Sequence, residues 1–284
     1  MDEAATEDDE TVLPELLRPL LGSGEIRRAR PVAAGWSNRV WRVLHDGGEV
    51  FVRLPGRDGA AGPEDRLREA GVWRLAAAAG IAPEPLFLDP LGGVLVTPAV
   101  AATDLGDRLA GAAPEPALLD ALGALLARFH ALDGSALPAL DPLARIDADL
   151  LRARCGGLVP DPAAVAALGR APALARTALA HHDLTPANVL AGARLWLVDL
   201  EHAGVGDADL DLVTLAVALD LDARSEARLF RAAGRPPPAA ERRRRLGELF
   251  HLREDAWAAA RLASGRGEAG LHRQLAASLA VLRD

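Results

Sequence analysis

The chain contains HHDLTPAN at residues 181–188, followed by LWLVDLE at residues 195–201, and these two segments are its most informative for fold and function. Asp183 lies on a polar loop that Pro186 stiffens, and Asn188 follows Asp183 by five positions. Apolar residues precede the loop and resume directly after it. This pattern predicts two short apolar strands, one on each side of a polar loop.

The polar residues of this stretch are of the types that phosphoryl transfer requires. That reaction needs an acceptor hydroxyl held in line, a group that receives its proton, and magnesium to offset the charge of the phosphates. Asp183 could face the acceptor, while Asn188 and Asp199 offer the hard oxygen ligands that Mg²⁺ prefers. Glu201 lies two residues beyond Asp199, so it is a candidate ligand for a second metal ion. Each residue alone is also compatible with a turn or a helix cap, so the hypothesis depends on the combination.

The first third of the chain is predicted to form an antiparallel sheet with one helix. Alternating apolar residues on both sides of the turn HDGG at residues 45–48 predict a hairpin. A periodic apolar segment that ends at Gly80 predicts a helix. The predicted strands are residues 30–34, 39–44, 49–54, 83–88 and 94–97, and the predicted helices are residues 11–24 and 64–79.

The remainder is predicted to be mainly helical. The expected helices are residues 115–131, 209–233, 239–263 and 267–282, with short helices on loops in residues 138–176. The fold class is therefore α+β and bilobal. The predicted division is an acidic tail with a leading helix (1–24), an N-terminal lobe (25–97), an irregular hinge (98–106) and a C-terminal lobe (107–284).

Composition narrows the possible partners and compartment. The net charge is −8, and six acidic residues lie in the first ten positions, so the body has no basic excess with which to bind nucleic acid. No apolar run reaches the roughly 18 residues of a membrane span, and the acidic N-terminus does not resemble a secretory signal. A single cysteine, Cys155, fits a reducing cytoplasm. The chain has no lysine, so any cation in its site must be arginine or histidine.

Residues 181–188 resemble the catalytic loop of aminoglycoside phosphotransferases and of choline and thiamine kinases. LVDLEHAG at residues 197–204 looks most like the choline and thiamine kinase branch, with Leu200 and His202 at positions that are usually aromatic there. The segment at residues 199–201 is Asp-x-Glu instead of Asp-Phe-Gly, and no Ala-Pro-Glu follows it, so an ordinary protein kinase is not expected. The resemblance covers roughly residues 30–220 and implies a protein-kinase-like fold.

The same resemblance implies a nucleotide site in the N-terminal lobe. GWSNRVWRV at residues 35–43 looks like the family's phosphate-binding loop. FVRLPG at residues 51–56 is similar to the strand that carries the phosphate-contacting cation, with arginine in place of the usual lysine, and an acid on the next helix would pair with that cation. Backbone after the last strand of the lobe would hold adenine. The implied nucleotide-binding residues are Ser37, Asn38, Arg53, Glu69, Thr97 and Val100.

The resemblance implies an ATP-dependent, magnesium-dependent kinase. Asp183 would be its catalytic residue, and Asn188, Asp199 and Glu201 would bind Mg²⁺. The γ-phosphoryl group of ATP would pass to a hydroxyl of a small acceptor. The expected acceptor is a cationic metabolite such as choline, ethanolamine or thiamine.

Four acidic or aromatic residues are candidates to hold such an acceptor. Asp207, Asp209, Asp211 and Trp257 could bind its positive charge by ion pairing and cation–π contact.

Three other functions remain compatible with the sequence. One is an aminoglycoside-modifying phosphotransferase, which would use the same loop on an antibiotic. A second is a non-catalytic nucleotide-binding protein, which the replacement of lysine by Arg53 keeps open. A third, from a different class, is a metal hydrolase that would use His181, His182, Asp183 and Asp199 as ligands.

Overall fold

The computed structural model describes Leu13, Glu15, Leu17, Arg18 and residues 25–32, 38–56, 62–265 and 269–283. The chain divides into two compact units. The first unit comprises Met1–Arg108, Leu132–Pro138 and Ala187–Gly204, and the second comprises Leu109–Ala131, Ala139–Pro186 and Val205–Asp284. The predicted division into lobes with separate roles stays a prediction.

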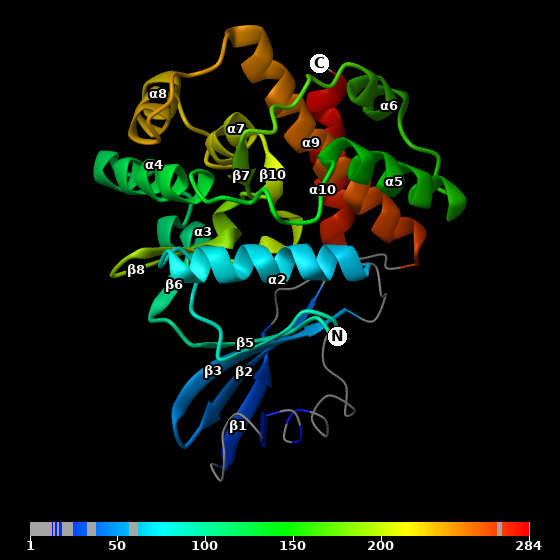
Figure 1. Ribbon diagram of the computed structural model, residues 1–284. Coiled ribbons are helices and arrows are strands. Elements are labelled where there is room, and N and C mark those ends of the chain that lie inside the picture. The colour runs from blue at the N-terminus through cyan, green and yellow to red at the C-terminus, as the bar shows by residue number, and fades with distance from the viewer. Residues whose placement is uncertain are drawn as a thin grey trace. The chain divides into compact units, whose positions relative to one another are not determined.

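The first unit contains a five-stranded antiparallel sheet (Figure 1). Its strands, in spatial order, are β1 (Ile26–Pro31), β2 (Asn38–His45), β3 (Gly48–Pro55), β5 (Val94–Pro98) and β4 (Phe87–Asp89). The β2–β3 hairpin confirms the alternation in the sequence, because every second residue of β3 from Val50 to Leu54 is buried. The strand predicted at residues 83–88 was placed too early. Pro83 and Pro85 have no N–H group to donate, so the ladder begins after them.

Apolar side chains of the sheet form one hydrophobic cluster. Trp41, Val43 and Val52 are its buried centre, and the helical residues Leu13 and Leu17 pack into it. Each fully buried side chain of this kind contributes about 1.5–3 kcal/mol. The predicted leading helix is therefore supported at its described residues, and the rest of residues 11–24 lies outside them.

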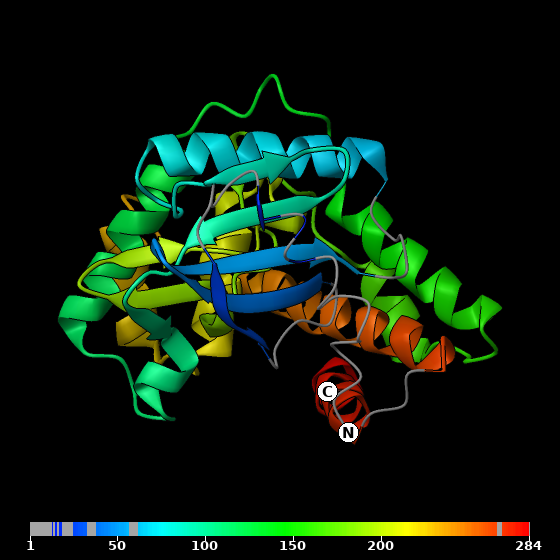
Figure 2. The same ribbon diagram turned by 90° about the horizontal axis from the view of Figure 1, so that it is seen from below.

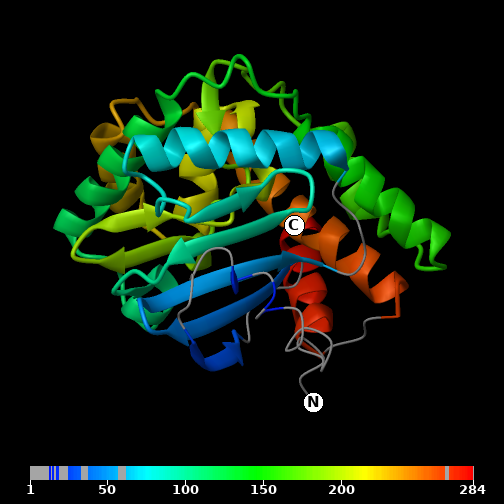
Figure 3. The same cartoon turned by 60° about the horizontal axis from the view of Figure 1, so that its bottom comes forward.

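Helix α2 (Pro63–Ala78) confirms the helix predicted at residues 64–79 (Figure 3). Proline at its first position and two acids in its first turn favour its start, and Gly80 takes a positive φ just after its end. Arg66 Nη1 donates to the Leu91 carbonyl at 2.6 Å, and Trp73 Nε1 donates to the Pro83 carbonyl at 3.0 Å. These bonds attach α2, near its start and in its second half, to the segments around β4.

The segment predicted as an irregular hinge instead has regular structure. Residues 98–106 contain strand β6 (Ala102–Asp104) and the first residues of helix α3 (Leu105–Leu109). β6 pairs with β8 (Val189–Gly192), which also pairs with β9 (Leu195–Leu197). This strand was not predicted because the partner of β6 lies far along the chain, and a local pattern does not reveal such a partner. A hinge role for residues 98–106 stays a prediction.

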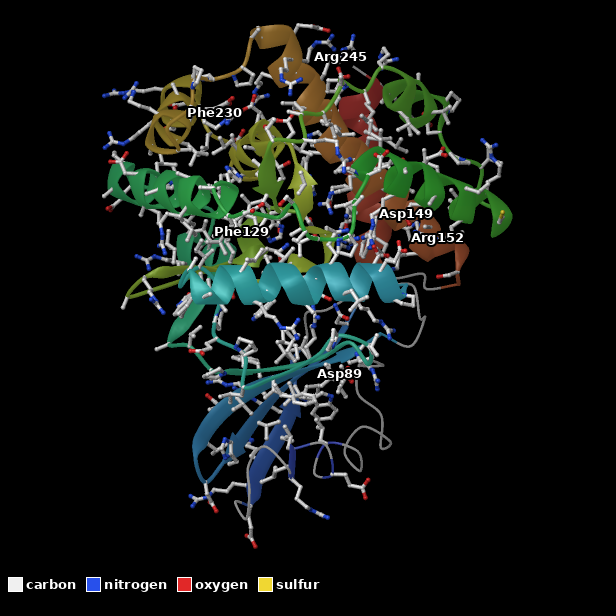
Figure 4. All side chains as sticks on the ribbon, viewed as in Figure 1. Asp89, Phe129, Asp149, Arg152, Phe230 and Arg245 are labelled. Atoms are coloured by element: carbon white, nitrogen blue, oxygen red, sulfur yellow. The ribbon has the colours of Figure 1, made fainter. Side chains whose placement is uncertain are left out.

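Helices dominate the second unit. They are α4 (Pro116–His130), α5 (Pro142–Cys155), α6 (Pro162–Gly169), α7 (Ala208–Ala218), α8 (Ala223–Ala232), α9 (Ala240–Ala263) and α10 (Ala269–Arg283). A two-stranded sheet of β7 (Ala178–Ala180) and β10 (Gly204–Gly206) accompanies them. Helix α9 is flanked by α10 and α5 (Figures 1 and 2). Phe129 of α4 and Phe230 of α8 are fully buried on neighbouring helices (Figure 4).

The long helix predicted at residues 209–233 is two helices in the structure. Residues 209–233 divide into α7 and α8, because Asp220 takes a left-handed φ of 48° and Asp222 then caps α8 by accepting from Ser225 N at 2.7 Å. The helices predicted at residues 239–263 and 267–282 are confirmed as α9 and α10. Among the described residues, no helix has both the length and the apolar character needed to cross a membrane.

Candidate nucleotide and acceptor sites

Arg53 and Glu69 form a buried ion pair in the first unit. Strand β3 carries Arg53 and helix α2 carries Glu69, and each side chain is only 12% exposed. Asp199 Oδ1 lies 3.9 Å from Arg53 Nη1. Burial alone would lower the pKa of Arg53, but Glu69, then Asp199 and Glu201, outweigh it and raise that pKa. Arg53 is therefore a permanent cation that is held in place beside a second carboxylate.

Asp199 lies in a strained turn. Its φ of 58° and ψ of 59° are left-handed, a conformation that costs a residue other than glycine about 1–2 kcal/mol. A 3₁₀ turn, η2 (Leu200–His202), follows directly, and Ala203 N donates to the Leu200 carbonyl at 3.0 Å. The Asp199 side chain is 42% exposed, so its carboxylate is accessible to a ligand.

Asn188 is brought close to Asp199 through the main chain. It ends the 3₁₀ turn η1 (Pro186–Asn188), and its carbonyl accepts a hydrogen bond from Val198 N at 3.0 Å. Val198 directly precedes Asp199, so two predicted magnesium ligands from separate motifs lie in one part of the first unit. The boundary between the units falls just before Ala187, and Asp183 therefore belongs to the second unit.

Glu201 is anchored on both carboxylate oxygens. Asn38 Nδ2 donates to Oε2 at 2.9 Å, and His202 Nε2 lies 3.5 Å from Oε1. Burial would raise the pKa of Glu201, but the contact with His202, the charge of Arg53 and the Asn38 hydrogen bond together hold that pKa well below its usual range. The Glu201 carboxylate is therefore ionised, and it accepts a hydrogen bond from the Asn38 amide. Ser37, predicted beside Asn38 in the phosphate loop, lies outside the described residues.

The predicted adenine-binding backbone lies at the end of β5. Thr97 is buried and pairs with Phe51 of β3. Ala99 N donates to the Glu49 carbonyl at 2.8 Å, and the Val100 carbonyl accepts from Ala102 N at 2.9 Å. The backbone around Val100 is thus ordered by hydrogen bonds to its neighbours, and its role in nucleotide binding stays a prediction.

The charges of the first unit fit a divalent cation. Three carboxylates, Glu69, Asp199 and Glu201, act on the guanidinium of Arg53, and the nearby Arg68 is paired with Asp65. This arrangement leaves an excess of negative charge beside an exposed carboxylate and the neighbouring Asn188. Oxygen ligands and surplus negative charge are what Mg²⁺ requires.

In the second unit, Asp211 of α7 organises the loop that contains Asp183. Its two buried oxygens accept the main-chain N–H groups of His181 at 2.7 Å and His182 at 2.9 Å. His130 Nε2 lies 3.0 Å from the same carboxylate. Burial would raise the pKa of Asp211, but His130 and the neighbouring histidines outweigh it and lower that pKa. Asp211 was predicted as an acceptor-binding acid, and its role in ordering this loop was not predicted, although an acid within the apolar run of α7 is a signal for a buried role.

The turn at His182 also depends on a glycine. His182 takes a left-handed φ of 61° and is buried. A Cβ atom at Gly206 of β10 would lie 1.9 Å from His182 Nε2, so only glycine leaves room for this ring. The loop before Asp183 is therefore set by packing as well as by Asp211.

Arg253 of α9 forms an ion pair with Asp183. The sequence did not predict a role for Arg253. The same Nη2 atom lies 2.5 Å from Glu254 Oε1. Burial would lower the pKa of Arg253, but Asp183 and Glu254 outweigh it and raise that pKa. A permanent cation thus holds the predicted catalytic carboxylate. No motif surrounds Arg253 in the sequence, so only its position in the fold reveals it.

The predicted acceptor-binding residues have internal partners. Asp207 is buried, caps α7 by accepting from Asp209 N at 3.0 Å, and pairs with Arg242. Asp209 pairs with Arg235 at 2.8 Å. These arginines would compete with a cationic acceptor for the two acids.

Trp257 is similarly occupied, because Arg261 Cζ lies 5.1 Å from its ring centroid. A cationic acceptor would compete with Arg261 for the face of this ring. Acceptor binding at Asp207, Asp209 and Trp257 stays a prediction.

A model of the phosphotransferase enzyme family, APH, matches residues 28–263. The chain belongs to this family. Membership confirms the family predicted from the motifs and makes the chain a phosphotransferase, which excludes the metal-hydrolase alternative. No curated protein matches the chain.

Solved structures of small-molecule kinases share this fold. A choline/ethanolamine kinase family protein from Mesorhizobium loti is 26% identical, with a TM-score of 0.72 over 98% of this chain and 96% of that chain. Choline kinase LicA from Streptococcus pneumoniae is 17% identical, with a TM-score of 0.78 over 98% and 99%. Macrolide 2′-phosphotransferase MphH from Brachybacterium faecium is 19% identical, with a TM-score of 0.65 over 94% and 97%. LicA has also been solved in complex with AMP, and that structure matches with a TM-score of 0.75 at 18% identity over 96% and 97%.

Proposed function

We propose that this phosphotransferase transfers the γ-phosphoryl group of ATP to a hydroxyl of a small cationic metabolite of the choline, ethanolamine or thiamine class. The observation that carries the proposal is the group of Arg53, Glu69 and Asp199 in the first unit. A buried, permanently charged guanidinium beside an accessible carboxylate suits a triphosphate together with its metal ion.

Each proposed role follows from the chemistry of a residue. Arg53, kept in place by Glu69, contacts phosphate oxygens. Asn188 and Asp199, with Glu201, supply oxygen ligands to Mg²⁺. Bound Mg²⁺ would offset the charge of the phosphates.

Asp183 serves the acceptor in this proposal. The acceptor oxygen forms a bond to the γ-phosphorus, the bond from that phosphorus to the bridging oxygen breaks, and ADP leaves. The proton of the acceptor hydroxyl passes to the Asp183 carboxylate, which is held by Arg253.

The acceptor class is proposed from two considerations. The similar proteins from Mesorhizobium loti and Streptococcus pneumoniae are named as choline or ethanolamine kinases. In addition, two carboxylates, Asp183 and Glu254, both contact Arg253, so acidic groups are available for a cationic acceptor. An antibiotic acceptor is the alternative, because MphH is a macrolide phosphotransferase.

A coupled assay of ATP consumption tests the proposal. Wild-type protein is supplied with Mg²⁺, ATP and a panel of choline, ethanolamine, thiamine, an aminoglycoside and a macrolide. We expect turnover with one of the three metabolites. Asp183→Asn should lower kcat by about 10²–10⁴-fold while nucleotide still raises the melting temperature. The exposed Asp220→Asn is the matched control, because asparagine tolerates the left-handed φ at that position.

Each other outcome changes the conclusion. Turnover with only the aminoglycoside or the macrolide would assign the antibiotic alternative. A nucleotide-induced thermal shift without turnover of any acceptor would favour a non-catalytic nucleotide-binding protein. Absence of both turnover and thermal shift would rule out the kinase function.

A further inference from the structure

Arg68 is a buried guanidinium next to Glu69 on helix α2. Its side chain is 1% exposed. Nε donates to the Ala203 carbonyl at 3.1 Å, and Nη2 donates to the Glu201 carbonyl at 3.3 Å. Nη1 pairs with Asp65 one turn earlier at 2.7 Å. All of these residues belong to the first unit. Helix α2, which carries Arg68, is the long cyan helix in Figure 3.

A buried charge of this kind needs partners on all sides. Removing a guanidinium from water costs several kcal/mol unless hydrogen bonds and an opposite charge replace the lost hydration. Arg68 obtains its opposite charge from its own helix, through Asp65, and donates two further hydrogen bonds to main-chain carbonyls. Its planar fork can bind both carbonyls at once, which a lysine ammonium cannot do with the same geometry.

The two carbonyls belong to the segment that sets the position of Asp199. A left-handed aspartate persists only where the surrounding structure holds it, since relaxation would release about 1–2 kcal/mol. Besides the contact of the Glu201 side chain with Asn38, two sets of hydrogen bonds hold the main chain just after Asp199. One is the Ala203–Leu200 hydrogen bond inside the turn. The other is the attachment of Glu201 and Ala203 to Arg68.

We infer that Arg68 is a positioning residue for the proposed magnesium site. It fixes the main chain at Glu201 and Ala203 and thereby holds the Asp199 carboxylate in its accessible, strained position. Its neighbour Glu69 fixes Arg53, so one turn of α2 sets both the metal-binding carboxylate and the phosphate-binding cation. The inference rests on the proposed function only for its magnesium readout.

Hydrogen exchange measured by mass spectrometry tests the positioning role without any assay of activity. Arg68→Met removes the charge and the donors while keeping most of the side-chain volume. We expect faster exchange in peptides covering residues 199–204 and unchanged exchange in β2 and β3. Arg66→Met is the matched control, because Arg66 lies on the same helix and donates to Leu91 rather than to residues 199–204.

Magnesium titration tests the consequence for the site. For Arg68→Met we expect the Mg²⁺ concentration that supports half-maximal turnover to rise about 10- to 100-fold, the usual effect of losing a residue that orients a metal ligand. The KM for the acceptor should stay within about twofold of wild type, because the hydrogen-bond partners described for Arg68 belong to the first unit and Asp183 belongs to the second. A general loss of stability would not produce this split.

Arg68→Lys keeps the inference testable if Arg68→Met does not fold. Lysine retains the charge but reaches fewer carbonyls, so exchange and magnesium dependence should fall between wild type and Arg68→Met. Exchange at residues 199–204 equal to that of Arg66→Met would overturn the inference, and so would an unchanged Mg²⁺ requirement in an active enzyme. If wild type shows no turnover, the proposed function fails, while the exchange result still decides whether Arg68 holds the turn.

Discussion

Arg253 Nη2 forms an ion pair with Asp183 Oδ1 and at the same time contacts Glu254. The guanidinium therefore holds one oxygen of the proposed catalytic carboxylate and separates two acids that would otherwise repel each other. Helix α9 thus contributes to the loop after β7, although the two segments are about 70 residues apart in sequence.

Replacing Arg253 should reduce the rate more than the binding of nucleotide. In Arg253→Met, Asp183 loses the cation that orients it, and a small misplacement of a reacting group costs on the order of 10²-fold in rate. We expect kcat to fall by about 10- to 100-fold with the KM for ATP unchanged, and Arg253→Lys to recover part of the loss. Steady-state kinetics with varied ATP and acceptor measure this. Arg244→Met, an exposed arginine on the same helix, should behave as wild type, and equal kcat values for both methionine variants would contradict the role.

Replacing Glu69 should destabilise the first unit. Glu69→Gln leaves the buried Arg53 without its closest counter-charge, and breaking a buried pair in this way costs about 3–5 kcal/mol. Chemical denaturation at neutral pH measures the loss, and the nucleotide-induced thermal shift should weaken with it. Glu64→Gln, in the exposed first turn of the same helix, is the control. A free energy of unfolding within about 1 kcal/mol of that control would show that Asp199 and Glu201 suffice for Arg53.

Replacing Asp211 should disturb the loop that carries Asp183. Asparagine offers one carbonyl oxygen where the structure needs acceptors for two main-chain N–H groups and for His130. Hydrogen bonds to charged groups contribute about 1.5–3 kcal/mol each, so Asp211→Asn should lower the free energy of unfolding by at least about 2 kcal/mol. Denaturation at pH 7 measures this, with Asp220→Asn as control.

The pH dependence of the same variant provides a second check. The pKa of Asp211 is lowered on folding. Its contribution to the free energy of unfolding is therefore fully present above the carboxyl's ordinary pKa of 3.8 and is lost as pH falls through the lower pKa of the folded protein. The difference in stability between wild type and Asp211→Asn should therefore shrink in acid. A difference that stayed constant from pH 7 to pH 3 would argue that the charge of Asp211 is not what stabilises the loop.

The local sequence pattern was sufficient to predict an element where the residues that stabilise it are close in sequence. The β2–β3 hairpin and helices α2, α4 and α9 follow from alternation, helical periodicity and end signals, all of which act within one element. Strand β6 did not follow, because its only described ladder partner, β8, lies more than 80 residues away. The break between α7 and α8 was missed because Asp220 and Asp222 read as ordinary helix residues until the left-handed φ is known.

The same limit applies to the candidate site. Arg53 and Glu69 could be named because a family resemblance supplied the pairing, not because the sequence showed it. Arg68 and Arg253 are single charged residues on helices, and nothing local separates them from solvated residues, whereas the apolar neighbours of Asp211 indicate only that it is buried. Their burial and their contacts with remote segments give them their roles, and these are properties of the fold.

Asp255 of α9 is a buried acid with an unusual environment. Its side chain is 2% exposed, and Oδ1 has no hydrogen-bond partner among the described residues. Burial, with a smaller contribution from Asp161, raises the pKa of Asp255 to about 6, and Arg283 opposes this only in part. Arg283 itself pairs with Asp161 at 2.5 Å, so its charge is shared.

The raised pKa predicts that the second unit loses stability as pH increases. The unfolded carboxyl ionises near its ordinary pKa of 3.8, whereas the folded one stays protonated until about pH 6, so stability falls between these two values and levels off above them. One pKa unit corresponds to about 1.4 kcal/mol, which sets an upper bound of about 3 kcal/mol on the loss.

Asp255→Asn, a neutral replacement of nearly the same shape, should remove this loss, so the variant should be more stable than wild type at pH 7.5 and nearly equal to it at pH 4. Denaturation across that range, with Asp220→Asn as control, measures the difference. Parallel curves for wild type and Asp255→Asn would mean that Asp255 is ionised in the folded protein and finds its compensation in Arg283.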